Sequence, residues 1–195
     1  YFDRAFGGDD PMTVDNAAKA VAAFERTLIT PNSPYDRYVK GDKGAMSGQQ
    51  VRGMNAFAEA GCMACHAGPA FNGPAQEPGT GFYMKFPTFS DNDYTRDHKF
   101  TDDGGRFEVT GKDTDKALWK VPTLRNIEVT APYFHNGSVK TLPEAVKVMA
   151  KTQLNMDLTE QQTADITAFL SALTGEFPEQ PMPRLPITPG RTIVE

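Results

Sequence analysis

The sequence predicts a mostly helical fold in which long irregular loops surround a bound group. Three observations carry this prediction. Apolar residues recur at helical spacing in several segments of the 195-residue chain, and three such segments open on a capping box. Residues 67–120 are rich in Gly, Pro and Asp and show little periodicity. Only 39% of the residues are hydrophobic, which makes a thin core for this length unless a cofactor adds apolar surface.

Two helices are predicted in the first third of the chain. Residues 1–11 are rich in Gly and Asp and are expected to form a loop. From Val14 the apolar residues follow helical spacing until a Pro-containing loop begins. Ser47 and Gln50 have the spacing of a capping box that opens a second helix. Gly61 is the residue at which this helix should end.

Two further helices are predicted in the last third. Residues 67–120 contain no clear periodic segment, although 106–110 could form a short strand. Capping boxes begin at Thr141 and at Thr159, and Gly175 is the expected stop of the second of these helices. The last 20 residues hold five prolines and are expected to form an extended tail on the surface.

Charge and composition exclude several classes of partner. The net charge is −5 and the pI is about 5.3, which argues against nucleic acid and against an anionic membrane surface. No segment approaches the ~20 apolar residues of a membrane-spanning helix.

The sequence begins at Tyr1 without Met and without a signal peptide, so we expect a fragment or a processed product.

The two cysteines belong to the most specific motif of the chain. Cys62-Met63-Ala64-Cys65-His66 has the C-x-x-C-H spacing of covalent c-type haem attachment. Two thiols on one turn can reach the two vinyl groups of one porphyrin, and the adjacent imidazole of His66 then becomes the proximal ligand of the iron. A porphyrin would also supply the apolar body that the composition lacks.

Two other chemistries suit this cysteine pair less well. A redox-active C-x-x-C normally lies in a βαβ pattern, which this sequence does not show. A structural zinc site needs two more Cys or His ligands nearby, whereas His98 and His135 lie far along the chain.

The residues alone do not decide which side chain binds the opposite face of the iron. Either Met or His can occupy that position. The downstream candidates are Met84, Met149, Met156, Met182, His98 and His135. Met149 stands out because it falls at the end of a well-capped helix, where the chain could return over the haem. A single methionine is nevertheless more often part of a core than a ligand.

Two aromatic residues could neighbour the haem. His135 precedes Asn136-Gly137, a turn signal, and is either a structural imidazole held at that turn or a neighbour of the haem. Trp119, the only tryptophan, is expected to pack against the haem or the core. His98 lies among charged residues and is expected at the solvated surface.

Two longer motifs resemble the bacterial dihaem cytochrome c peroxidase family, to which MauG-type enzymes are related. They are residues 119–126 (WKVPTLRN) and 130–138 (TAPYFHNGS). The resemblance extends to residues 23–28, 36–38 and 105–107 and to the helices within 141–175, and so to nearly the whole chain.

The resemblance implies a fold and a ligand set. In that family one half carries a peroxidatic haem and the other an electron-transfer haem, and this chain is similar to the second half, a class I-like cytochrome c domain. It implies one haem c here and a second in the other half, with His66 as proximal and Met149 as distal ligand. It also implies a calcium ion bound partly by the backbone carbonyls of Thr130 and Pro132. No catalytic residue can be assigned in this chain.

The resemblance also implies a function and a location. Electrons would come from a small periplasmic cytochrome c or cupredoxin and pass to the peroxidatic half, which reduces hydrogen peroxide to water; a homodimer is a further expectation. The rivals are a stand-alone monohaem carrier and half of a MauG-like enzyme that oxidises a protein. Within the chain we expect a lead-in segment (1–46), a haem domain (47–175) and a tail (176–195).

Overall fold

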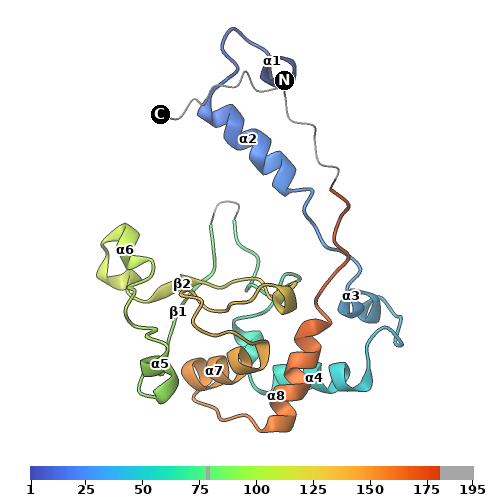
Figure 1. The fold of residues 1–195 in the computed structure, drawn as a ribbon, viewed down its shortest axis with the longest axis vertical. Coiled ribbons are helices and arrows are strands. Elements are labelled where there is room, and N and C mark those ends of the chain that lie inside the picture. Colours follow the sequence, from blue (N-terminus) through green and yellow to red (C-terminus); the bar gives the residue numbers. More distant parts are fainter. Residues whose placement is uncertain (78–79, 181–195) are drawn as a thin grey trace. The chain divides into compact units, whose positions relative to one another are not determined.

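The computed structural model describes residues 1–77 and 80–180 of the chain (Figure 1). The backbone contacts divide the chain into two compact units, one of Tyr1–Thr30 with Phe177–Glu195 and one of Pro31–Glu176. Residues 181–195, which make up most of the predicted tail, lie outside the described residues. Within the described ranges, no helix has both the length and the apolar character needed to cross a bilayer.

In the described part of the first unit lie two helices, α1 (Phe2–Phe6) and α2 (Val14–Glu25). The hydroxyl of Thr13 accepts a hydrogen bond from the backbone N–H of Asn16 and caps α2, so the predicted helix is confirmed. The expectation of a loop over residues 1–11 is wrong for α1. The aromatic rings at its two ends lie one helical turn apart, with centroids separated by 5.6 Å, and this pair favours a helical turn.

The second unit opens on α3 (Pro34–Val39) and α4 (Gly48–Glu59), both with complete capping boxes. The N–H of Gln50 donates to the hydroxyl of Ser47 at 3.2 Å, and the Gln50 side chain accepts from the Ser47 N–H at 2.8 Å. The predicted start of this helix is therefore confirmed. Its end is confirmed too, because Gly61 follows it with φ of 86°, in the left-handed region that favours glycine.

A small two-stranded sheet lies inside the irregular stretch. β1 (Tyr83–Lys85) pairs antiparallel with β2 (Leu118–Lys120), and Met84 lies opposite Trp119. These strands were not predicted because three residues are too few to show alternation. Between them lie α5 (Asp93–Asp97), α6 (Phe107–Thr110) and the 3₁₀ turn η2 (Asp113–Asp115).

The expected strand at 106–110 is wrong. The segment forms α6, with Arg106 as its N-cap, and ends where the N–H of Gly111 donates to the carbonyl of Phe107 at 2.8 Å. Gly111 has φ of 64°, a left-handed conformation that closes a helical turn and that a continuing strand cannot contain. The glycine after this segment was the available signal.

The last two helices complete the second unit. The 3₁₀ turn η3 (Ile127–Val129) leads to α7 (Leu142–Leu154) and α8 (Glu160–Ser171). Thr141 caps α7 through the N–H of Glu144, and α8 has the complete box predicted from Thr159. The prediction that α8 ends at Gly175 is wrong, because the helix ends at Ser171.

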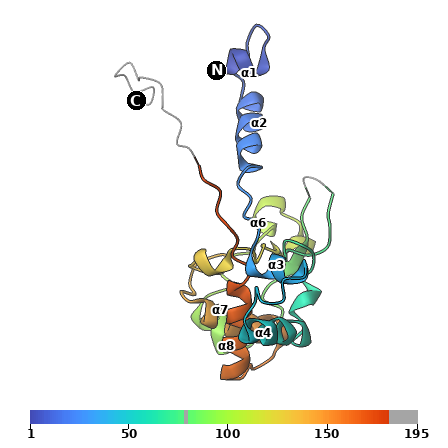
Figure 2. The ribbon, with the colours of Figure 1, turned by 90° about the vertical axis from the view of Figure 1, so that its right-hand side faces the viewer.

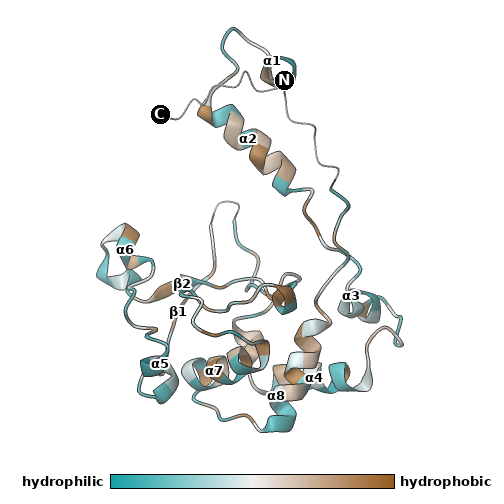
Figure 3. Ribbon diagram, in the orientation of Figure 1, coloured by the Kyte–Doolittle hydropathy of each residue, from teal (hydrophilic) through white to brown (hydrophobic). Residues whose placement is uncertain are grey.

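The core of the second unit forms where α4 crosses α8, with α7 packed alongside α8 (Figures 1 and 2). Gly53 allows the close approach: a Cβ there would lie 1.8 Å from the carbonyl oxygen of Asp165. Phe57, Phe71 and Phe169 pack edge-on or tilted around the crossing, with ring centroids 5.4–6.5 Å apart. Figure 3 shows hydrophobic residues along the middle of these helices and hydrophilic residues at the start of α4 and of α8.

Candidate functional site

The C-x-x-C-H motif follows α4 directly. Gly61 turns the chain, and Cys62–Ala64 form the 3₁₀ turn η1. The backbone N–H groups of Cys65 and His66 both donate to the carbonyl of Cys62, at 3.3 and 2.9 Å. The two cysteines and the histidine therefore lie on one compact turn, which is the arrangement that haem attachment requires.

The pKa values of the two thiols are shifted in the direction opposite to that of a redox-active pair. Both cysteines are free and half-buried. Burial raises the pKa of the Cys62 thiol to about 11 and also raises that of Cys65. Redox-active pairs depend on a lowered thiol pKa. Across residues 1–77 and 80–180, no three His, Cys, Asp or Glu side chains converge as a zinc site would need.

His66 is oriented by a single hydrogen bond. Its Nδ1 lies 2.9 Å from the carbonyl oxygen of Phe71, so Nδ1 carries the proton and donates it. The side chain is buried, and this burial lowers the pKa of His66 despite the hydrogen bond, which acts in the opposite direction. His66 is therefore a neutral imidazole whose other nitrogen, Nε2, is free to bind a metal.

The predicted ligands line one apolar cavity of about 170 Å³. η1 and the residues just after it supply Cys62, Cys65 and His66, and α7 supplies Met149. The apolar side chains that line the same cavity are Phe57, Pro122, Leu124, Ile127, Tyr133, Phe134, Leu142, Val146, Leu154, Leu158, Ile166 and Leu170. The fold thus brings Met149 to the same cavity as the C-x-x-C-H motif.

A second cavity of about 350 Å³ adjoins the first and shares Cys65, His66 and Met149 with it. Trp119 and His135 also line it and stack on each other. The indole Nε1 of Trp119 and the Nε2 of His135 are buried, and neither has a hydrogen-bond partner within the described residues. Burial lowers the pKa of His135, although the charge of Asp103 opposes this.

The other candidate ligands differ in whether they line one of the two cavities. Met84 also lines the second cavity, whereas Met156 and His98 line neither. The prediction that His98 is solvated is wrong: its side chain is 16% exposed and stacks on Phe100, with centroids 5.3 Å apart. Met182 lies outside the described residues.

The residues predicted to bind calcium line the second cavity. Thr130 and Pro132 follow η3, and both line this cavity. Their backbone carbonyls accept no hydrogen bond within the described chain. Oxygen ligands suit calcium, but two carbonyls make only part of the six to eight that it takes.

Sequence reasoning missed the residues that hold His66 in place. The carbonyl of Phe71 is one example, since a backbone acceptor leaves no mark in the residue type. Phe71 has φ of 53°, and the turn it occupies is closed by its own N–H, which donates to the carbonyl of Gly68 at 3.1 Å. The short Gly-containing loop after C-x-x-C-H was the only available signal.

These residues fit a covalently bound haem. Two free thiols lie on one turn, a neutral imidazole keeps Nε2 available, and a thioether shares their apolar cavity. Comparison with known proteins agrees with this chemistry. The cytochrome c551 peroxidase of Nitrosomonas europaea is 40% identical to this chain over 185 residues, which cover 95% of this chain and 52% of that protein. The cytochrome c551 peroxidase of Pseudomonas aeruginosa is 39% identical over 192 residues, covering 98% and 53%.

The family model for di-haem cytochrome c peroxidase matches residues 1–44. Over nearly its whole length the chain is similar to members of the di-haem cytochrome c peroxidase family. It spans about half the length of the two peroxidases it matches. Among solved structures, a MauG-like protein associated with microbial copper homeostasis superposes with a TM-score of 0.70 at 28% identity, covering 90% of this chain and 57% of that one. The mostly helical fold predicted from the sequence is thus confirmed.

Proposed function

We propose that this chain is the electron-transfer haem domain of a periplasmic di-haem cytochrome c peroxidase, with a class I-like cytochrome c fold. The observation that carries the proposal is the shared cavity. Cys62, Cys65 and His66 of the contiguous motif line the same apolar space as Met149, which lies far along the chain on α7. This is the donor set of a covalently attached, six-coordinate haem c.

Each residue has a distinct role in this proposal. Cys62 and Cys65 attach the haem through thioether bonds. His66 would hold the iron through Nε2 while its Nδ1–H stays on the Phe71 carbonyl, and the thioether of Met149 would be the second protein ligand. When bound, haem c supplies a one-electron iron couple, and methionine ligation raises its potential above that of a bis-histidine site.

The apolar walls suit electron transfer better than peroxide chemistry. The side chains that line the first cavity are almost entirely apolar, and the titratable groups among them are the two thiols, the predicted ligand His66 and the buried phenol of Tyr133. Such a lining makes the first cavity poor in groups that could move a proton at a bound peroxide, whereas His135 lines the second cavity. Turnover would therefore need a second, peroxidatic haem domain in the same protein.

At the level of the whole protein, we propose that a small periplasmic cytochrome c or cupredoxin delivers electrons to this domain. The peroxidatic domain would then combine two electrons and two protons with hydrogen peroxide to give two water molecules. The two relatives named cytochrome c551 peroxidase, at 39–40% identity, support this activity.

We also propose that the carbonyls of Thr130 and Pro132 supply two of the oxygen ligands of a calcium ion.

A MauG-like function is the second candidate, because a MauG-like protein shares the fold. A tyrosinate ligand would be one sign of it, and Tyr133 lines the cavity. However, the Tyr133 hydroxyl donates to the carbonyl of Ile127 at 3.1 Å. Burial also raises the pKa of Tyr133, as does the charge of Glu128, so the phenol stays protonated at neutral pH. These contacts favour Met149.

Intact mass and haem staining of the native, full-length protein test the proposal. We expect one covalent haem on the segment that contains this chain and a second elsewhere in the protein, together with peroxidase turnover. A protein that carries a single haem and does not reduce peroxide would instead be a monohaem electron carrier. Absence of covalent haem from Cys62 and Cys65 would overturn the site itself.

A further inference from the structure

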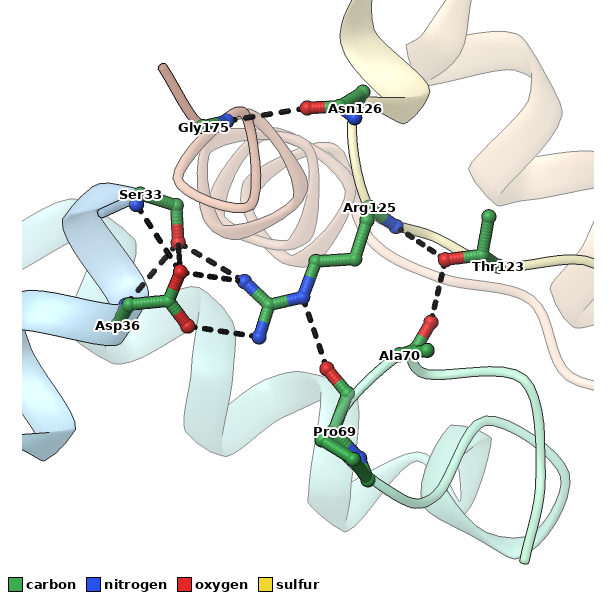
Figure 4. A network of polar contacts seen from close by, with 8 residues as sticks. All are labelled: Ser33, Asp36, Pro69, Ala70, Thr123, Arg125, Asn126 and Gly175. Carbon is green, nitrogen blue, oxygen red and sulfur yellow. Dashed lines mark hydrogen bonds and ion pairs between the residues drawn. The ribbon is translucent and has the colours of Figure 1, made fainter. Parts of the chain in front are cut away.

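Three consecutive backbone carbonyls in the loop after C-x-x-C-H each accept a hydrogen bond from a side chain. Arg125 donates through Nε to the carbonyl of Pro69 at 2.9 Å, and Thr123 donates through its hydroxyl to the carbonyl of Ala70 at 2.6 Å (Figure 4). The next carbonyl, that of Phe71, accepts from Nδ1 of His66 at 2.9 Å. Side chains from residues 123–125 therefore hold the loop that orients His66.

Arg125 is itself held by an ion pair. Its two terminal nitrogens contact the two carboxylate oxygens of Asp36 at 2.8 and 2.9 Å, and one of them also donates to the hydroxyl of Ser33 at 3.1 Å (Figure 4). The side chains of Arg125 and Asp36 are only 19% and 18% exposed. This two-pronged geometry fixes the guanidinium plane, since both ends of the fork are occupied.

The guanidinium also lies near the ring of Phe71. Its central carbon is 5.7 Å from the centroid of that ring, within the range of a cation–π contact. The Phe71 side chain is 2% exposed and packs on Phe169. Arg125 thus constrains the loop both through the carbonyl of Pro69 and through the side chain of the residue that accepts from His66.

We propose that Arg125 and Thr123 are positioning residues for His66. They hold residues 69–71 so that the Phe71 carbonyl stays aligned with Nδ1 of His66. This inference rests on the proposed function, since it concerns His66 as an iron ligand. A strong hydrogen bond from Nδ1 makes the imidazole a better electron donor, which stabilises ferric iron and lowers the reduction potential.

The chemistry explains why arginine occupies position 125. A guanidinium can donate to Asp36 with its two terminal nitrogens and to the carbonyl of Pro69 with Nε at the same time. A lysine ammonium keeps the charge but lacks this rigid fork, so it cannot reproduce all three contacts in the same plane.

The test is the haem midpoint potential of full-length, haem-loaded variants that preserve net charge. Arg125→Lys and Thr123→Val should both shift the potential of this haem upwards, and should move the NMR signal of the His66 Nδ1 proton. The matched control is Arg106→Lys, which alters the Arg106–Asp115 ion pair away from this loop. It should leave the potential at the wild-type value.

The outcomes separate this proposal from the proposed function. A wild-type protein without covalent haem on Cys62 and Cys65 overturns the proposed function and this inference with it. With haem in place, an unchanged potential in both test variants, or an equal shift in Arg106→Lys, overturns the positioning role alone. If Arg125→Lys does not fold, Thr123→Val decides, because it leaves the ion pair with Asp36 intact.

Discussion

Trp119 and His135 lie flat against each other, with ring centroids 4.1 Å apart and planes inclined by only 14°. β2 carries the indole, and the imidazole belongs to the turn before Gly137, whose N–H donates to the carbonyl of Phe134 at 3.2 Å. The predicted turn at His135 is thus confirmed. Both rings line the cavity that also contains His66 and Met149. This places the only tryptophan of the chain beside the proposed haem.

The first prediction uses this tryptophan as a probe. If haem fills the two cavities, the Trp119 emission is strongly quenched in the folded, haem-loaded protein, because the porphyrin accepts its excitation energy at close range. Unfolding in denaturant should restore the emission. The contribution of Trp119 is measured as the difference between the wild type and Trp119→Phe. A bright Trp119 signal from the folded protein would contradict a haem in this position.

The second prediction concerns the distal ligand. Met149→Leu should abolish the thioether-to-iron charge-transfer absorption band and open one iron position, since leucine has no donor atom. Met149→His should keep six ligands but lower the reduction potential. Met84→Leu is the matched control, because Met84 lines the second cavity and is not expected to bind the iron. Survival of the band in Met149→Leu would show that another residue is the ligand.

The third prediction concerns the crossing of α4 and α8. Gly53→Ala would place a Cβ 1.8 Å from the Asp165 carbonyl oxygen, so the helices must separate. We expect the free energy of unfolding of the haem-loaded protein to fall by about 1–3 kcal/mol in denaturant titration. Gly48→Ala is the control, since its new Cβ would meet nothing closer than Arg52 Nη1 at 3.9 Å. Equal stability of the two variants would contradict the close packing at Gly53.

The fourth prediction is a pH dependence that comes from Asp36. Burial alone would raise the pKa of this carboxyl, but hydrogen bonds from Arg125 and Ser33 outweigh it and hold the pKa below its ordinary value of 3.8. The unfolded state therefore binds a proton more readily than the folded state. The stabilisation of the fold by the ionised Asp36 is therefore fully present above pH 3.8. It is lost as the pH falls below 3.8 and passes the lower pKa of the folded state.

Denaturant titrations of the wild type and of Asp36→Asn between neutral pH and acid measure this effect. The difference in unfolding free energy between the two proteins should be constant at neutral pH and shrink in acid, because asparagine cannot ionise. A difference that stays constant down to the lowest pH would show that the Asp36 carboxylate does not stabilise the fold.

Local signals in the sequence predicted four of the eight α-helices in the described residues, namely α2, α4, α7 and α8. The capping boxes at Ser47 and Thr159 and the left-handed Gly61 depend on contacts within a few residues, and all three were confirmed. The two strands were missed for a different reason. β1 and β2 are too short for periodicity and exist only because they pair with each other across the irregular stretch.

The sequence by itself predicted the chemistry of the proposed attachment site, because C-x-x-C-H is contiguous and its geometry is local. It could not choose among several methionines and histidines for the opposite face, since that choice depends on where α7 packs. Only the tertiary structure brought Met149 to the cavity, placed His135 against Trp119 and joined Asp36, Pro69 and Arg125 in one network. These contacts link residues far apart in the chain, and they form only when the helices pack around a common core.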